Sequence, residues 1–164
     1  MAKSDKRYNE RSIIKITNFQ FDSDSDTKSR YVLILRKHDG KILFVTLSTK
    51  QFNPDKSPLR AGLNKNRKGE VLCYRFIKNK SVGMHNGWSF PMTCNINLSV
   101  SASIFEAEES KFKALYDADC EFQTILEIKP FYKDIVYGVY RSKGVTKKFK
   151  IILEKDLERD YGPL

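Results

Sequence analysis

The stretch "SRYVLILRKHDGKILFVTLSTK", residues 29–50, constrains the fold more than any other part of the sequence. Two apolar runs flank the dipeptide Asp39-Gly40, which is a strong signal for the two-residue turn of a β-hairpin. A turn of this type pairs His38 with Lys41 and sets the register of the two strands behind it. Both faces of the hairpin are apolar in the middle, so we expect it to lie at the centre of the fold.

Polar side chains stand at the open end of this hairpin. Counting back from the turn places Arg30 opposite Thr49 and Tyr31 opposite Ser48. Opposed side chains on one face are about 5 Å apart at Cβ. The register therefore predicts contact between Arg30 and Thr49, with Lys50 next in the chain. The face predicted for Arg30 also carries Val32, Ile34, Val45 and Leu47.

A guanidinium and a hydroxyl at one strand end suit the chemistry of a phosphodiester. The guanidinium offers forked donors that match phosphate oxygens, and the hydroxyl adds a donor or an acceptor. The plainer interpretation is an exposed strand end, because strand ends are often polar. Arg30 and Thr49 thus form a hypothesis about a phosphate site, with a simple surface contact as its alternative.

The charge balance of the chain favours a polyanionic partner. The 164 residues fit a single domain. They carry a net charge of +10 with a pI near 9.5. Such a balance is typical of proteins that contact nucleic acid or anionic lipid. The alternative is a soluble surface rich in lysine.

Several classes of protein are excluded by what the sequence lacks. No run approaches the ~20 apolar residues of a membrane span. The charged start "MAKSDKRYNERS" is not a secretory signal, so we expect a cytoplasmic protein with no membrane partner. The widely spaced Cys73, Cys94 and Cys120 and only two histidines argue against zinc. We expect buried free thiols, and neither metal nor cofactor.

The remaining pattern places strands early and helices late, which predicts an α+β fold. We expect a basic, flexible arm at 1–10 and one domain over 11–164. Strands are predicted at 11–21, 71–78, 93–100 and 120–128, loops at 22–30, 50–70 and 79–91, and helices at 103–117 and 146–162. The segment 129–144 is open between helix and strand. This order indicates a small, strongly curved antiparallel sheet or barrel with one to three helices, mainly in the C-terminal half.

Further candidates for binding lie in the loops. The clearest cationic patch of the 50–70 loop consists of Arg60, Lys65, Arg67 and Lys68, which could contact RNA phosphates or simply be solvated. His85 has a side chain suited to acid–base work, although a surface histidine is the plainer interpretation. Trp88 could stack on an unpaired base, or pack in the core.

Over residues 11–50, which include the hairpin, the chain resembles the PemK/MazF-like toxins, small ribonucleases of bacterial toxin–antitoxin systems. The similar pieces are "IIKITNF", "RYVLIL", "HDGK" and "ILFVTLSTK". The last piece, with Lys50 after the hydroxyl pair, also resembles the toxins of the same fold that are controlled by RNA antitoxins. The family usually has proline after the arginine, where this chain has Tyr31, and the 50–70 insertion is additional.

The resemblance implies a barrel-like fold, usually a homodimer, and a protein or RNA antitoxin as partner. It also implies metal-independent cleavage of single-stranded RNA, in which a ribose 2′-hydroxyl attacks the adjacent phosphate. Arg30 would then stabilise the phosphate charge, Thr49 or Ser48 would hydrogen-bond a phosphate oxygen, and Lys50 would add positive charge. The alternative is a non-catalytic nucleic-acid-binding or protein-interaction module on the same barrel.

Overall fold

The fold is α+β, with eight strands in two antiparallel sheets and three α-helices among the described residues. The computed structural model describes residues 5–20, 28–50, 53, 56, 58–84, 86–99 and 102–161, with side chains to residue 154. The strands are β1 (Ser12–Phe19), β2 (Lys28–His38), β3 (Lys41–Thr46), β4 (Gly62–Lys65), β5 (Val71–Phe76), β6 (Cys94–Asn97), β7 (Ile104–Glu108) and β8 (Cys120–Ile125). The helices are α1 (Glu109–Tyr116), α2 (Lys133–Arg141) and α3 (Lys147–Tyr161).

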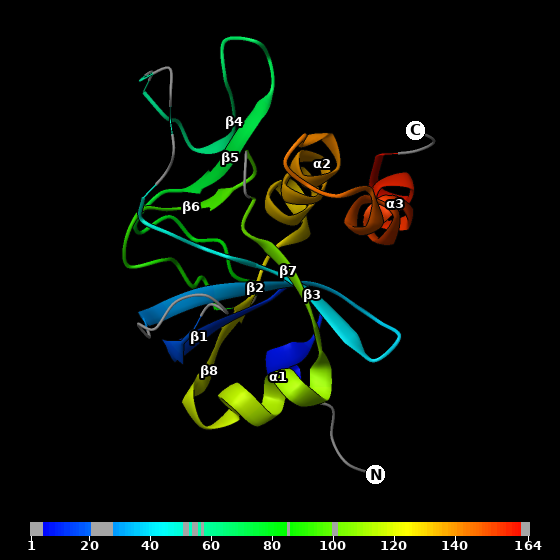
Figure 1. Ribbon diagram of the computed structural model, residues 1–164. Helices are drawn as coiled ribbons and strands as arrows, with labels where there is room; N and C mark the ends of the chain where they lie inside the picture. The colour runs from blue at the N-terminus through cyan, green and yellow to red at the C-terminus, as the bar shows by residue number, and fades with distance from the viewer. Residues whose placement is uncertain are drawn as a thin grey trace.

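The two sheets do not close into a barrel, so this part of the prediction is wrong. One sheet has the order β7-β3-β2-β1-β8 and the other the order β4-β5-β6. Figure 1 shows α1 below the five-stranded sheet, with α2, α3 and the small sheet above it. Of the described helices, none is long and apolar enough to cross a membrane.

The hairpin of β2 and β3 is central, as the sequence predicts. The four consecutive residues 32–35 of β2 are at most 1% exposed. Leu33 and Leu35 pack in the core cluster toward α2, whereas Val32 and Ile34 pack in the cluster toward α1. Burial on both faces explains why this strand is an unbroken apolar run rather than an alternating one.

The predicted turn is confirmed, but the predicted register beyond it is wrong. Asp39 and Gly40 have positive φ values of 49° and 73°, and His38 pairs with Lys41. The register then shifts between Ile34 and Arg36, so that Leu35 is an extra residue in β2.

This β-bulge separates the predicted pair of Arg30 and Thr49. The ladder between β2 and β3 ends at Val32 and Thr46, before either residue is reached. The predicted faces change as well, because Val32 packs with Phe44 rather than with Val45. One added residue in a strand turns every following side chain to the other face.

The segment 129–144, which the sequence left open between helix and strand, is mainly helical. Most of this segment forms α2, and the turn before it, Ile128–Tyr132, contains Lys129 with a non-helical backbone. Ile135, Val136 and Val139 of α2 are fully buried against the core. Helix α3 agrees with the helix predicted at 146–162.

The helix predicted at 103–117 begins later than expected. Its first half is strand β7, which pairs with β3, and α1 starts only at Glu109. Glu106 therefore lies in a strand, where its carboxylate accepts from Lys148 Nζ at 2.9 Å and lies 2.8 Å from His38 Nε2. Pairing with the open edge of β3 has overridden the local helical preference.

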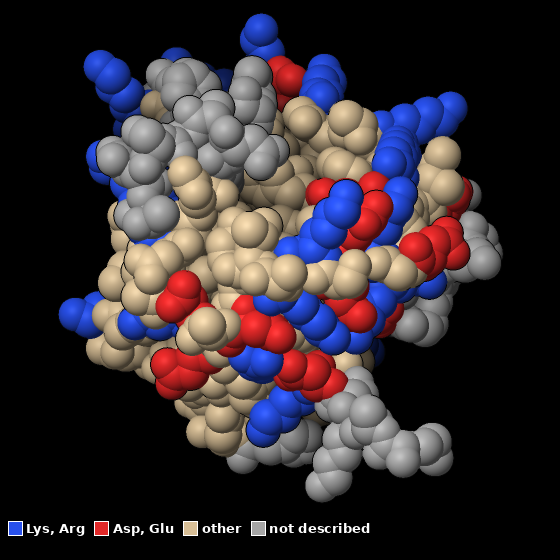
Figure 2. Space-filling model, turned by 60° about the horizontal axis from the view of Figure 1, so that its bottom comes forward, with Lys and Arg blue, Asp and Glu red and all other residues tan. Residues whose placement is uncertain are grey.

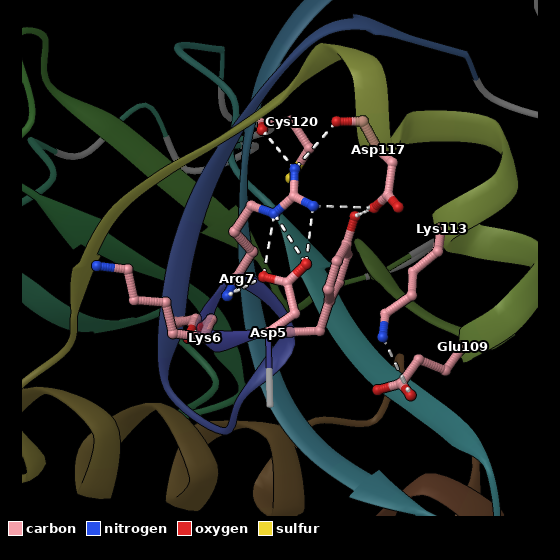
Figure 3. Close-up of polar contacts among 9 residues, drawn as sticks. Asp5, Lys6, Arg7, Glu109, Lys113, Asp117 and Cys120 are labelled. Carbon is pink, nitrogen blue, oxygen red and sulfur yellow. Dashed lines mark hydrogen bonds and ion pairs between the residues drawn. The ribbon is translucent and has the colours of Figure 1, made fainter. Parts of the chain in front are cut away.

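The N-terminal residues are docked from residue 5 onward rather than forming a free arm. Figure 3 shows Arg7 between Asp5 and Asp117, next to the end of α1. Its Nη2 donates to Asp5 Oδ2 at 2.7 Å, and its Nη1 donates to the carbonyls of Asp117 and Cys120, both at 3.0 Å. Tyr8, which donates to the Asp117 carboxylate, is fully buried. Residues 1–4 lie outside the described residues.

Replacing Arg7 with alanine is expected to lower the free energy of unfolding by about 1–3 kcal/mol at neutral pH, because charged hydrogen bonds are lost. The hydrogen bond from Arg7 is the main cause that lowers the pKa of Asp5 below its ordinary value. The stability from this pair is therefore complete above the unfolded pKa of ~3.9 and is lost as pH falls through the lower folded value.

Urea unfolding at pH 7 and at about pH 3 checks this expectation. The difference between the wild-type chain and Arg7→Ala should narrow in acid. Lys111→Ala is the control, since this lysine is 76% exposed in its ion pair with Glu108 and should change little. A difference that stays constant with pH would contradict the role given to Arg7.

Candidate nucleic-acid interface

A hollow of about 360 Å³ opens where β2 begins and β3 has ended. We call it the basic hollow. Four of its lining residues are the predicted Arg30, Ser48, Thr49 and Lys50. The others are Lys15, Lys28, Ser29, Tyr31, Leu47, Pro91, Met92 and Cys94. The structure thus brings the four predicted residues together, although not through the predicted cross-strand pair.

The course of the chain after β3 forms one wall of the basic hollow. Leu47 N still donates to Tyr31 O at 3.0 Å, which holds the chain beside β2. Ser48 then pairs with Asn95 of the small sheet, with N–H···O distances of 2.9 and 2.8 Å. This crossing from one sheet to the other carries Thr49 and Lys50 to the start of β2.

The polar groups of the basic hollow differ in how firmly they are held. Ser48 Oγ accepts from Lys50 N at 3.1 Å, which forms a local turn. Arg30 is partly buried, and its Nη1 donates to Leu47 O at 3.5 Å. Thr49 and Lys50 are exposed. The arginine is therefore placed at the wall, while the exposed hydroxyl and ammonium can meet a ligand.

The electrostatics of the basic hollow are one-sided. Four of its lining residues are cationic, namely Lys15, Lys28, Arg30 and Lys50. Among the described residues that line it, none carries a carboxylate or an imidazole. Such a site attracts anions, because the fields of these cations add and none of the described lining residues supplies a negative charge.

The face that carries α1 has a different character. Figure 2 shows Asp and Glu interleaved with Lys and Arg on that side of the molecule. Glu109 lies 2.8 Å from Lys37 Nζ and 3.6 Å from Lys113 Nζ, and these lysines hold the pKa of its carboxyl below the usual value. The opposite charges on this face largely cancel, so it attracts a polyanion only weakly. The basic hollow is therefore the better candidate for a nucleic-acid interface.

Aromatic side chains support the basic hollow from behind. The Tyr31 ring makes edge-to-face contacts with Trp88 and Phe90, at centroid distances of 5.7 and 5.2 Å. Burial raises the pKa of Tyr31 and raises that of the Cys94 thiol to about 12. Both groups are therefore neutral near pH 7. Trp88 packs here and is not among the lining residues, so its contact with RNA stays a prediction.

The three cysteines are free and buried, as the sequence predicts. Burial raises the pKa of Cys73 to about 11 and also raises that of Cys120. Buried thiols with raised pKa values are poor nucleophiles. In the described part of the chain, no group of three or more His, Cys, Asp or Glu residues is arranged to hold a metal ion.

The predicted cationic patch of residues 50–70 lies elsewhere. This segment is not one long loop, since β4 occupies Gly62–Lys65 and pairs with β5. Arg67 and Lys68 lie in the turn of the β4–β5 hairpin, at the top of Figure 1 and away from the start of β2. None of the patch residues Arg60, Lys65, Arg67 and Lys68 lines the basic hollow. His85 lies outside the described residues.

Lys15 and Lys28 are the cations that the sequence did not single out. Lys15 pairs with Tyr31 across β1 and β2, and Lys28 begins β2. The only signal for Lys15 in the sequence is its place between the apolar residues Ile14 and Ile16. Recognising it required the pairing of β1 with β2, which the sequence did not specify.

Comparisons with known proteins do not add to this description. No protein-family model matches the chain, and neither the curated proteins nor the solved structures contain a significant match.

Proposed function

We propose that the chain binds single-stranded RNA in the basic hollow and cleaves it there as a toxin-type endoribonuclease. The observation that carries the proposal is the convergence of Arg30, Thr49 and Lys50, with Lys15 and Lys28, on one cavity without an acidic lining residue among those described. RNA binding depends on such phosphate contacts. The resemblance of residues 11–50 to PemK/MazF-like toxins supports the choice of RNA, although the two sheets do not form the closed barrel that the resemblance implies.

The proposed reaction needs no metal. The ribose 2′-hydroxyl attacks the adjacent phosphate, its proton passes to a base, and the 5′-oxygen leaves with a proton. The products are a 2′,3′-cyclic phosphate and a 5′-hydroxyl. In this scheme Arg30 and Lys50 stabilise the added negative charge on the phosphate, and Thr49 hydrogen-bonds one of its oxygens.

Incubation of the purified chain with single-stranded RNA in EDTA tests the proposal. We expect fragments that end in 2′,3′-cyclic phosphate, identified by mass spectrometry. An RNA whose 2′-hydroxyls are methylated should stay intact, because the nucleophile is missing. Cleavage that requires added metal, or none at high protein concentration, would contradict the reaction.

One observation favours a second candidate, which is RNA binding without cleavage. The described lining of the basic hollow offers no carboxylate or imidazole, the side chains that most often act as general base. This candidate predicts salt-dependent binding of intact RNA by the same cations. The EDTA experiment separates the two, since binding without fragments supports only the second.

Salt dependence measures how many lysines contact phosphate. Each phosphate contact to a single strand contributes about 0.7 to the slope of log K against log salt concentration. We expect Lys28→Ala and Lys50→Ala each to reduce that slope by about this amount in fluorescence anisotropy titrations. Lys111→Ala on α1 is the control and should leave it unchanged. Unchanged slopes for both hollow variants would place the RNA elsewhere, and Arg67→Ala would then test the hairpin tip.

The partners and location belong to the same proposal. A toxin-type nuclease would act in the cytoplasm and be held by a protein or RNA antitoxin, and the family resemblance adds a possible homodimer. Sedimentation at several protein concentrations measures the oligomeric state. A cell-growth assay with and without the neighbouring genes tests for an antitoxin.

A further inference from the structure

The basic hollow has a second kind of lining besides its cations. Tyr31, Pro91 and Met92 contribute aromatic and apolar surface to the same cavity. A phosphate alone would not interact favourably with such surface. A nucleotide suits both parts of the lining, because cations bind its phosphate and aromatic or apolar groups pack against its base.

Met92 is an exposed apolar side chain inside the basic hollow. It is 44% exposed and lies two residues before Cys94, the buried residue that begins β6. A single exposed apolar residue needs no explanation on a convex surface. The position of Met92 is different, because it lies in a cavity lined by Lys28, Arg30 and Lys50. These cations keep water in the cavity, and a ligand with an apolar part would displace that water from Met92.

The ring of Tyr31 is held in place before any ligand arrives. Phe90, which is fully buried, meets it edge to face at 5.2 Å with an interplanar angle of 88°, and Trp88 meets it at 5.7 Å. Lys15 Nζ lies 5.9 Å from the Tyr31 centroid. A ring that is already ordered loses little conformational entropy when a base packs against it.

We infer that the basic hollow takes up one unpaired base against Tyr31, Pro91 and Met92 while the neighbouring phosphate lies among the cations. This inference rests on the proposed RNA binding and adds its substrate class, which is a strand with an unstacked nucleotide. The volume of about 360 Å³ is at the lower end of small-molecule sites, which span ~300–1,000 Å³. A duplex cannot present a base to it, because paired bases are stacked inside the helix.

The chemistry of the lining also limits how the base is recognised. Arg30 and the lysines are assigned to the phosphate, and the described lining contains no Asn, Gln, Asp or Glu, the other side chains that read base edges. The base is therefore held by packing, with little distinction between sequences at this position. Stacking of this kind is tolerant of sequence because every base has a π-face.

The experiment compares two oligoribonucleotides of equal length and charge whose 2′-hydroxyls are methylated to prevent cleavage. One carries its bases and the other is abasic. We expect the wild-type chain to bind the base-bearing strand at least about fivefold more tightly by fluorescence anisotropy. Met92→Ala should reduce this preference and leave the affinity for the abasic strand unchanged. Leu115→Ala is the matched control, since Leu115 is 70% exposed on α1, and it should alter neither affinity.

The outcomes separate this inference from the function on which it rests. Equal affinity of the wild-type chain for both strands would overturn the base site and leave RNA binding by the cations intact. A preference that Met92→Ala does not change would also overturn it, provided that urea unfolding shows the variant to be folded. No binding of either strand at low salt would overturn the proposed RNA binding itself.

Discussion

Arg30→Ala is expected to lower the rate of RNA cleavage by about 10²–10³-fold, the usual loss when one donor to a developing oxyanion is removed. Arg30 is partly buried at the wall of the basic hollow, with Nη1 3.5 Å from Leu47 O. Its forked donors are therefore placed to meet the phosphate as charge accumulates on it. Because Lys28 and Lys50 remain, RNA binding should weaken by only about tenfold or less.

Single-turnover cleavage and anisotropy titration separate these two effects. Arg36→Ala is the matched control, since it removes the same charge from the same strand near the turn, beside Leu43 of β3. It should leave the rate within about twofold of the wild-type value. An equal loss of rate in both variants would show that net charge, rather than the position of Arg30, determines cleavage.

Phe90→Ala is expected to lower the free energy of unfolding by about 3–5 kcal/mol, the usual range for a fully buried phenylalanine. Phe90 is 0% exposed, and its ring centroid lies 4.8 Å from that of Trp88, 4.9 Å from that of Phe76 and 5.2 Å from that of Tyr31. Removing the ring leaves a cavity between these side chains. The same change frees Tyr31, so the preference for base-bearing RNA should also fall.

Urea unfolding followed by fluorescence measures this loss. Phe90→Leu should lose less free energy of unfolding than Phe90→Ala. It is the variant to measure if Phe90→Ala does not fold. Leu115→Ala should stay within about 0.5 kcal/mol of the wild-type value, because that side chain is exposed. A loss below about 1 kcal/mol for Phe90→Ala would contradict the position of this ring in the core.

The central hairpin shows where local chemistry was sufficient and where it was not. Asp39-Gly40 determines its own turn, because the backbone there needs two positive φ values that this dipeptide adopts readily. The bulge at Leu35 left no mark in the sequence. Residues 32–35 are buried on both faces, so a shift by one residue exchanges one apolar side chain for another and the pattern stays the same.

The sequence predicted which residues meet at the candidate site, but it did not predict how they are arranged. Arg30, Ser48, Thr49 and Lys50 do share a cavity, since both ends of the hairpin lie at the same edge of the fold. The predicted cross-strand pair of Arg30 and Thr49 is wrong, because the register shifts at Leu35 and Ser48 leaves the hairpin to pair with Asn95. That pairing joins residues far apart in the chain, and single-sequence patterns carry little information about such contacts.

By itself, the sequence determined the hairpin, its turn, the late helices and the positive charge, because each depends on neighbouring residues or on composition. Only the tertiary structure decided that the sheets stay open, that residues 104–108 form an edge strand, and that Lys15, Lys28 and Met92 join the predicted residues in one cavity. The physical reason is that these features arise from strand pairing over long separations, where the free energy comes from partners that the local sequence does not name.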